Sequence, residues 1–70
     1  MPTLQQQALA VFKLKDVYGR TLAYPLNDAA VYVCRLTGNK TLRAMDLPNV
    51  VGLGFLPVTE HGERIIPEMI

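Results

Sequence analysis

The segment from residue 10 to residue 26 constrains the fold most, because apolar residues recur at every second position on both sides of Gly19. These positions are Ala10, Phe12 and Leu14 before the glycine and Leu22, Tyr24 and Leu26 after it. A period of two is typical of a half-buried strand, and glycine tolerates the positive φ of a tight turn. The segment therefore predicts a β-hairpin, in which Pro25 marks a strand end or an edge.

Residues 27–38 carry the signals of a helix at both ends. Asn27 or Asp28 can accept hydrogen bonds from the first free amides of a helix, and Gly38 can close it in the left-handed conformation. The apolar residues between them recur near helical spacing. Residues 31–33 also suit a strand because they are β-branched and aromatic, but the two end signals favour a helix.

Residues 41–54 predict a helical turn followed by a short helix. Thr41 is a possible N-cap of the turn, and Asp46 is the expected cap of the helix. Pro48 costs about 3 kcal/mol inside a helix but is tolerated in a first turn. A single helix beginning at Asp46, without the preceding turn, is the alternative.

The remaining chain predicts two short strands, residues 55–59 and 64–70, around the polar stretch 60–63. The expected order is therefore ββααββ, an α+β fold with an N-terminal hairpin, a helix-turn-helix-like pair and a C-terminal strand or hairpin. The apolar tail either packs on the core or stays exposed for a partner.

Seventy residues make one small domain, which we place at residues 10–70 after a flexible lead-in, residues 1–9. Half of the residues are apolar, as in globular proteins, but no apolar run is long enough to span a membrane. Cys34 is the single cysteine, so an internal disulfide is excluded and a reducing, cytoplasmic setting is expected. A chain this small often gains stability from a partner, which makes a homodimer one possibility.

Residues 56–66 hold the only histidine, His61, between Glu60 and Glu63. General acid–base catalysis needs such groups to converge on a cleft, whereas side chains on a hairpin tip point apart into water. A zinc site would need a second histidine or a pair of cysteines. We therefore expect a polar turn at Gly62 and predict no enzyme activity, no metal and no cofactor.

Two clusters of cations are candidate contact surfaces. The first lies on the predicted hairpin and consists of Lys13, Lys15, Tyr18 and Arg20. It suits an acidic protein surface or a phosphate backbone, with Tyr18 as an aromatic anchor; the alternative is an edge protected by solvated lysines. The second consists of Arg35, Lys40 and Arg43 around the link between the helices. It suits an anion or nucleic acid, or it complements a helix dipole.

The order of a helix, a tight "GNK" link, a second helical segment and a hairpin resembles a winged helix–turn–helix. The resemblance implies that Lys40 contacts phosphate, that residues 60–64 form the wing, and that a recognition segment carries Thr41, Arg43 and Asn49. The sequence departs from that pattern because Pro48 interrupts the recognition segment and the wing is acidic. The net charge of +1 also lacks the strong basic bias of a nucleic-acid binder.

Residues 17–25, 38–42 and 53–55 resemble stretches of small regulatory proteins encoded by phages and mobile elements, over roughly residues 11 to 56. That resemblance implies binding of a host protein or a nucleic acid, often to alter transcription, in the host cytoplasm. The expected function is a small, non-enzymatic regulatory protein that binds a host protein such as a component of the transcription machinery. The alternative is a DNA-binding transcriptional regulator that uses the helix pair and the C-terminal hairpin.

Overall fold

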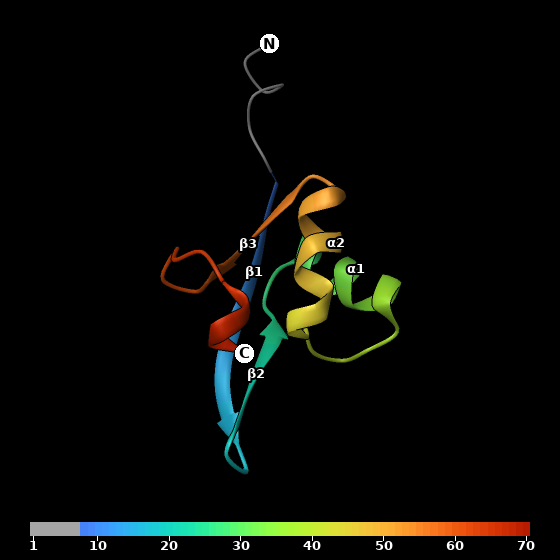
Figure 1. Ribbon diagram of the computed structural model, residues 1–70. Coiled ribbons are helices and arrows are strands. Elements are labelled where there is room, and N and C mark those ends of the chain that lie inside the picture. Colours follow the sequence, from blue (N-terminus) through green and yellow to red (C-terminus); the bar gives the residue numbers. More distant parts are fainter. Residues whose placement is uncertain (1–7) are drawn as a thin grey trace.

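A computed structural model describes residues 8–70 as a small α+β domain built on a three-stranded mixed sheet (Figure 1). The elements in chain order are β1 (Ala8–Val17), β2 (Arg20–Pro25), α1 (Asp28–Thr37), η2 (Ala44–Asp46), α2 (Leu47–Gly52), β3 (Phe55–Thr59) and η3 (Pro67–Met69), where η marks a 3-10 turn. The strand order is β2-β1-β3, with β1 antiparallel to β2 and parallel to β3. The predicted α+β class, N-terminal hairpin and two helices are therefore confirmed. The prediction of a fourth strand over residues 64–70 is wrong.

The hairpin closes through a two-residue turn in which both residues have positive φ, 52° at Tyr18 and 79° at Gly19. This pair is typical of the type I′ turn, whose twist matches that of the flanking strands. Val17 faces Arg20 across the turn, and this pair sets the register of the whole hairpin. The first strand begins at Ala8, so two residues expected in the lead-in belong to β1; residues 1–7 lie outside the described residues.

Asn27 joins the hairpin to α1 through three hydrogen bonds. Its Oδ1 accepts from the amide of Ala30 at 2.9 Å, which caps the helix, and from the amide of Val11 at 3.1 Å. Its Nδ2 donates to the carbonyl of Leu9 at 2.8 Å, so the side chain continues the pairing of β1 after β2 has ended. The helix closes at Gly38 with φ 79°, as predicted, and Asn27 rather than Asp28 is its cap.

The link between the helices lies along the edge of β2. The amide of Leu42 donates to the carbonyl of Ala23 at 2.9 Å, which forms an isolated bridge with that strand. The turn before α2 begins after Arg43, so Thr41 is not its cap. Pro48 lies in the first turn of α2, as predicted, but the Asp46 side chain makes no capping bond to that helix.

The chain after β3 does not form the expected strand. The hydroxyl of Thr59 accepts from the amides of His61 and Glu63 at 3.2 Å each, which turns the chain away from the line of β3. One isolated bridge, Val58 with Arg64, returns toward the sheet before the chain enters η3. Proline has no amide to donate to a ladder, which is the reason that Pro67 begins a 3-10 turn and not a strand.

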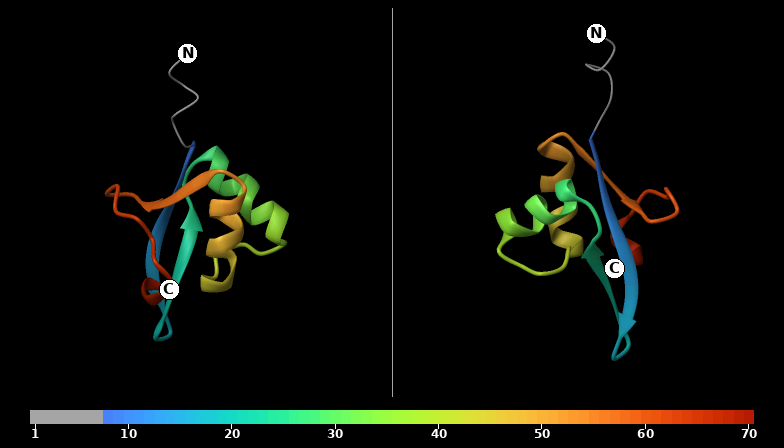
Figure 2. Two further views of the ribbon diagram at one scale, coloured as in Figure 1. Left: turned by 45° about the horizontal axis from the view of Figure 1, so that its top comes forward. Right: turned by 180° about the vertical axis from the view of Figure 1, so that it is seen from behind.

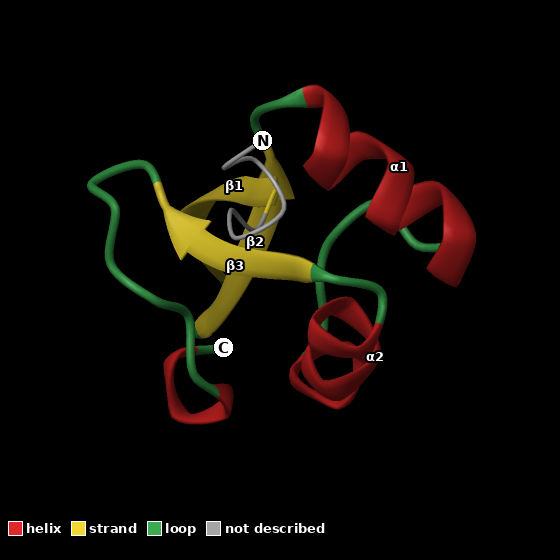
Figure 3. Ribbon diagram, turned by 90° about the horizontal axis from the view of Figure 1, so that it is seen from above, coloured by secondary structure: helices red, strands yellow, loops and turns green. Residues whose placement is uncertain are grey.

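The core lies on one face of the sheet, on which α1 contacts β1 and β2 and α2 contacts β3. Figures 2 and 3 show the two helices together on the same side of the strands. The buried apolar residues of this core are Ala10, Phe12, Ala23, Ala30, Val33, Cys34, Leu42, Leu47, Val50 and Ile65. The tail therefore packs on the core through Ile65. No helix within residues 8–70 is both long enough and apolar enough to cross a membrane.

Candidate functional site

The opposite face of the sheet carries no helix and is called the open face below. Side chains alternate along a strand, and Ala10 and Phe12 are buried on the helix-covered face. The odd-numbered residues of β1 therefore point to the open face. Residues paired across the sheet share a face, which assigns the partners on β2 and β3. The open face consists of Leu9, Val11, Lys13, Lys15 and Val17 on β1, Arg20, Leu22 and Tyr24 on β2, and Leu56 on β3. Val58 points to the same side of β3 but is buried.

The charged side chains at the strand positions of the open face are all cations. Lys13, Lys15 and Arg20 are exposed there, opposite Tyr24, Leu22 and Val17 in the hairpin ladder. The neighbouring carboxylate, Asp16, belongs to the helix-covered face, where it accepts a hydrogen bond from the Thr21 hydroxyl at 2.7 Å. The three cations therefore lie on one face of the hairpin, and Asp16, the nearest carboxylate in the sequence, lies on the other face.

Tyr18 stands at the tip of the hairpin, which projects beyond the helices (Figure 1). Its side chain is 100% exposed, and its backbone has a positive φ of 52°. This conformation costs a bulky L-residue on the order of 1 kcal/mol relative to glycine. The hairpin therefore presents an aromatic ring to solvent at an energetic cost. Of the predicted first cluster, the three cations share the open face and Tyr18 extends it at the tip.

The second predicted cluster is spread over α1, the link and η2. Arg35 lies in the last turn of α1, with its guanidinium carbon 5.9 Å from the centre of the Tyr32 ring. At that distance a cation–π contact holds the side chain against its own helix. Lys40 is exposed in the link between the helices.

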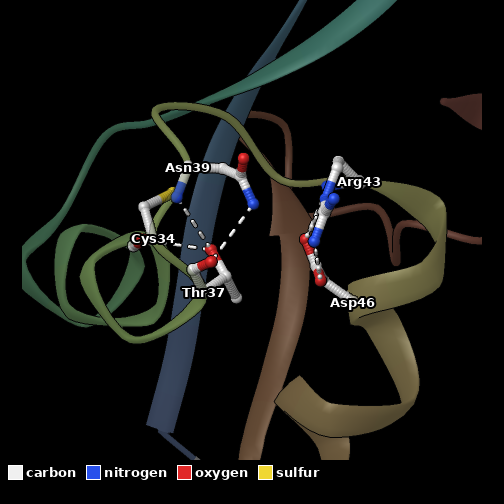
Figure 4. A network of polar contacts seen from close by, with 5 residues as sticks. All are labelled: Cys34, Thr37, Asn39, Arg43 and Asp46. Atoms are coloured by element: carbon white, nitrogen blue, oxygen red, sulfur yellow. Dashed lines mark hydrogen bonds and ion pairs between the residues drawn. The ribbon is translucent and has the colours of Figure 1, made fainter.

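Arg43 is bound by Asp46, as Figure 4 shows. Its Nε donates to Oδ2 at 3.1 Å and a terminal nitrogen donates to Oδ1 at 3.2 Å, while the backbone amide of Arg43 also reaches Oδ2 at 3.2 Å. The Asp46 residue is 3% exposed, and its carboxylate raises the pKa of the Arg43 guanidinium. This pair stabilises the turn that precedes α2. The guanidinium group of Arg43, which would otherwise be free to bind a phosphate, is already bound to Asp46.

Cys34 belongs to the core on α1 and is 6% exposed. Burial, together with the nearby negative charge of Asp46, raises the pKa of its thiol. A thiol is a much weaker nucleophile and metal ligand than a thiolate, so this environment favours a packing role. Within the described part of the chain, no group of three or more histidine, cysteine or acidic side chains is placed to hold a metal ion.

Two hollows lie on the helix-covered side. The larger, about 530 Å³, runs between α2 and the C-terminal segment. Its lining is Leu47, Pro48, Val51, Pro57, Arg64, Ile65, Ile66 and Pro67. The smaller, about 140 Å³, lies at the end of β3. It is lined by Leu14, Thr59, Glu60, His61, Glu63 and Met69, and the turn at Gly62 has a positive φ of 87°.

The basic residues of the open face were predicted from the sequence as a contact surface, but the apolar residues beside them were not assigned to that surface. Leu22 and Tyr24 share a face, as predicted, and that face is the open one because Ala23 is the buried residue of β2. The two-residue turn was the available signal, since it places Tyr24 opposite Lys13. No family model, curated protein or solved structure matches this chain in the three comparisons made.

Proposed function

We propose that this chain is a small, non-enzymatic binding protein that docks an acidic protein surface on its open face. The single observation that carries the proposal is the row of three exposed cations, Lys13, Lys15 and Arg20, on an apolar sheet face without a carboxylate at its strand positions. Sheet faces in small domains are ordinarily covered or polar, so an apolar face with one sign of charge suits a partner of the opposite charge.

The side chains between the cations suit a protein partner better than a phosphate backbone. Tyr24 and Leu22 are partly buried on β2, opposite Lys13 and Lys15, and Tyr18 adds an exposed aromatic ring at the tip. Aromatic and aliphatic groups supply most of the binding energy in protein interfaces, whereas the surrounding charges steer the approach and set the register. A phosphate backbone would use the cations and leave the apolar groups without contacts.

The resemblance of residues 17–25 to stretches of small phage-encoded regulatory proteins supports a host protein as the partner that we propose, such as a component of the transcription machinery. A regulatory role follows from that proposal, because a chain that only binds can act only by changing what its partner does. In this proposal the protein works in the host cytoplasm, without a cofactor.

The test compares capture of host proteins by the native chain and by a variant with Lys13→Glu, Lys15→Glu and Arg20→Glu. We expect a specific acidic partner whose recovery falls at least about tenfold with the variant, because each reversed charge opposes the partner's own. A Lys40→Glu variant is the matched control and retains the partner. Equal recovery by all three proteins, or no specific partner at all, would contradict the proposal.

The alternative, a DNA-binding regulator using the helix pair, draws its support from the exposed cations Arg35 and Lys40. It loses support from the engagement of Arg43 with Asp46 and from the shortness of α2, which has six residues. Titration into duplex DNA at low and physiological salt tests it. Binding with a steep salt dependence that Lys40→Glu reduces would favour the alternative over the open face.

A further inference from the structure

The two outer strands pair with different stretches of the central strand, β3 with residues 8–12 and β2 with residues 12–17. β3 pairs with β1 from Ala8 to Phe12 and ends at Thr59, opposite Phe12. The second half of β1, residues 13–17, pairs with β2 alone. A position for a further strand therefore remains beside residues 13–17, in line with β3, and we call it the vacant position.

The backbone of β1 offers hydrogen bonds to the vacant position. The carbonyl of Val11 accepts from the amide of Leu26 at 2.8 Å and its amide donates to Asn27, so the odd-numbered backbone groups of β1 point toward β2. Backbone groups alternate along a strand, so those of Leu14 and Asp16 point the other way. No backbone group outside the named strands bonds to them within residues 8–70.

The chain after β3 leaves this position because Thr59 turns it outward. The Thr59 carbonyl accepts from the amide of Gly62 at 2.9 Å, and its amide donates to the carbonyl of Glu63 at 2.7 Å. The hollow of about 140 Å³ opens at this point, with Leu14 and Met69 among its lining residues. The vacant position is thus bordered on the helix-covered side by a hollow large enough for an apolar side chain.

We propose that residues 13–17 of β1 accept a strand of the partner protein in which acidic and apolar residues alternate. This inference rests on the proposed function and specifies how the partner binds. Strand addition of this kind takes its affinity from main-chain hydrogen bonds and its specificity from alternate side chains. One set of side chains meets Lys13 and Lys15 on the open face and is acidic. The other set meets Leu14 and the hollow and is apolar.

The charges also define what the vacant position rejects. Glu60 and Glu63 border the hollow, so a carboxylate on that side of the added strand would meet like charge. A second copy of this chain is disfavoured as well, because antiparallel pairing of two such edges brings the lysines of both copies onto one face. Lysines on an edge strand are a general protection against self-pairing, and here the same lysines admit an acidic strand.

The test uses a defined probe, the blocked peptide acetyl-Val-Glu-Val-Glu-Val-Glu-Val-amide, and the isotopically labelled full chain. Amide hydrogen exchange is measured residue by residue by NMR with and without saturating peptide. We expect exchange at Leu14 and Asp16 to slow at least about tenfold, because their amides gain partners. Exchange at Lys13 and Lys15 should change little, since those amides already bond to β2.

Two controls separate strand addition from loose electrostatic attraction. The first is the peptide with lysine at every glutamate position, and the second has the same composition in blocks, Val-Val-Val-Val-Glu-Glu-Glu. Neither should protect Leu14 or Asp16. In a Lys13→Glu, Lys15→Glu variant the preference should reverse, so that the lysine peptide protects these two amides and the glutamate peptide does not.

Absence of any protection at Leu14 and Asp16 at millimolar peptide would overturn the inference, as would equal protection by the block peptide. Protection that appears without peptide on raising the protein concentration would assign the edge to a second copy instead. If host-protein capture depends on Lys13, Lys15 and Arg20 while the peptide fails, only the strand-addition inference falls and the proposed function stands.

Discussion

The two halves of β1 belong to one continuous strand, yet they have different partners and occupy different environments. Residues 8–12 pair with β3, form hydrogen bonds with Leu26 and Asn27 on the other edge, and bury Ala10 and Phe12 completely. Residues 13–17 pair with β2 alone and carry three charged side chains. The first half belongs to the stable interior and the second half is a projecting ribbon. A two-stranded ribbon is marginally stable by itself, so the first half anchors a surface that the second half presents.

The largest effect should come from truncating the anchored half. Phe12→Ala should lower the free energy of unfolding by about 3–5 kcal/mol, because Phe12 is fully buried and leaves a cavity. Leu14→Ala, in the projecting half, should cost clearly less since Leu14 is only partly buried. Urea unfolding followed by circular dichroism measures both; equal costs would mean that the two halves are buried alike.

Removing the Asn27 side chain should weaken the same anchored half from outside the strand. Asn27→Ala should cost about 2 kcal/mol, because it removes the helix cap and the two bonds to β1 at Leu9 and Val11. Asn27→Asp is the control: it keeps the capping oxygen and loses only the donor to Leu9, so its cost should be smaller. A larger cost for Asn27→Asp than for Asn27→Ala would refute this division of roles.

Amide exchange should divide β1 near residue 13 even without a partner. The amides of Ala10 and Phe12 face β3, so they should exchange at least about tenfold more slowly than those of Leu14 and Asp16. The internal control is the amide of Val11, which bonds to Asn27, together with the amides of Lys13 and Lys15, which bond to β2. A uniform gradient along all five even-numbered amides would instead indicate fraying from the hairpin tip.

Tyr18→Asn should stabilise the projecting half slightly. Asparagine tolerates positive φ better than tyrosine, so the gain should be about 0.5 kcal/mol. The same change should weaken partner capture, because it removes the exposed ring. Thermal unfolding and capture, measured on the same preparation, separate the two effects; a variant that is more stable and binds equally well would remove Tyr18 from the proposed contact.

The smallest effect is the pH dependence at Cys34. Burial raises the pKa of the native thiol above its ordinary value of 9.0, so the unfolded chain loses this proton first as pH rises. Stability from this group is complete below the ordinary pKa and is lost as pH rises through the folded pKa. Comparing the native chain with Cys34→Ala between pH 7 and 10 should show the steeper decline in the native chain. Parallel curves would contradict a raised thiol pKa.

The two basic clusters show how well cations in a sequence predict a contact surface. Both were predicted from exposed cations close in the sequence, but Arg43 finds Asp46 three residues later across a 3-10 turn. On the hairpin, alternation carries Asp16 to the face opposite Lys15. Adjacent residues on a strand point to opposite faces, so Asp16 does not pair with Lys15. Residues three apart on a helical turn lie on the same side, so Asp46 does pair with Arg43.

Local signals determined the hairpin, its glycine turn, and α1 from its first residues to Gly38. These depend on φ preferences, alternation and caps, all of which act within a few residues. Only the tertiary structure decided that β3 runs parallel beside β1, that it stops at Thr59, and that the last residues pack instead of forming a strand. Strand pairing between residues 8–12 and 55–59 joins segments more than forty residues apart in the chain. No periodicity in either segment encodes its partner, and so the open face and the vacant position emerge only when the chain is folded.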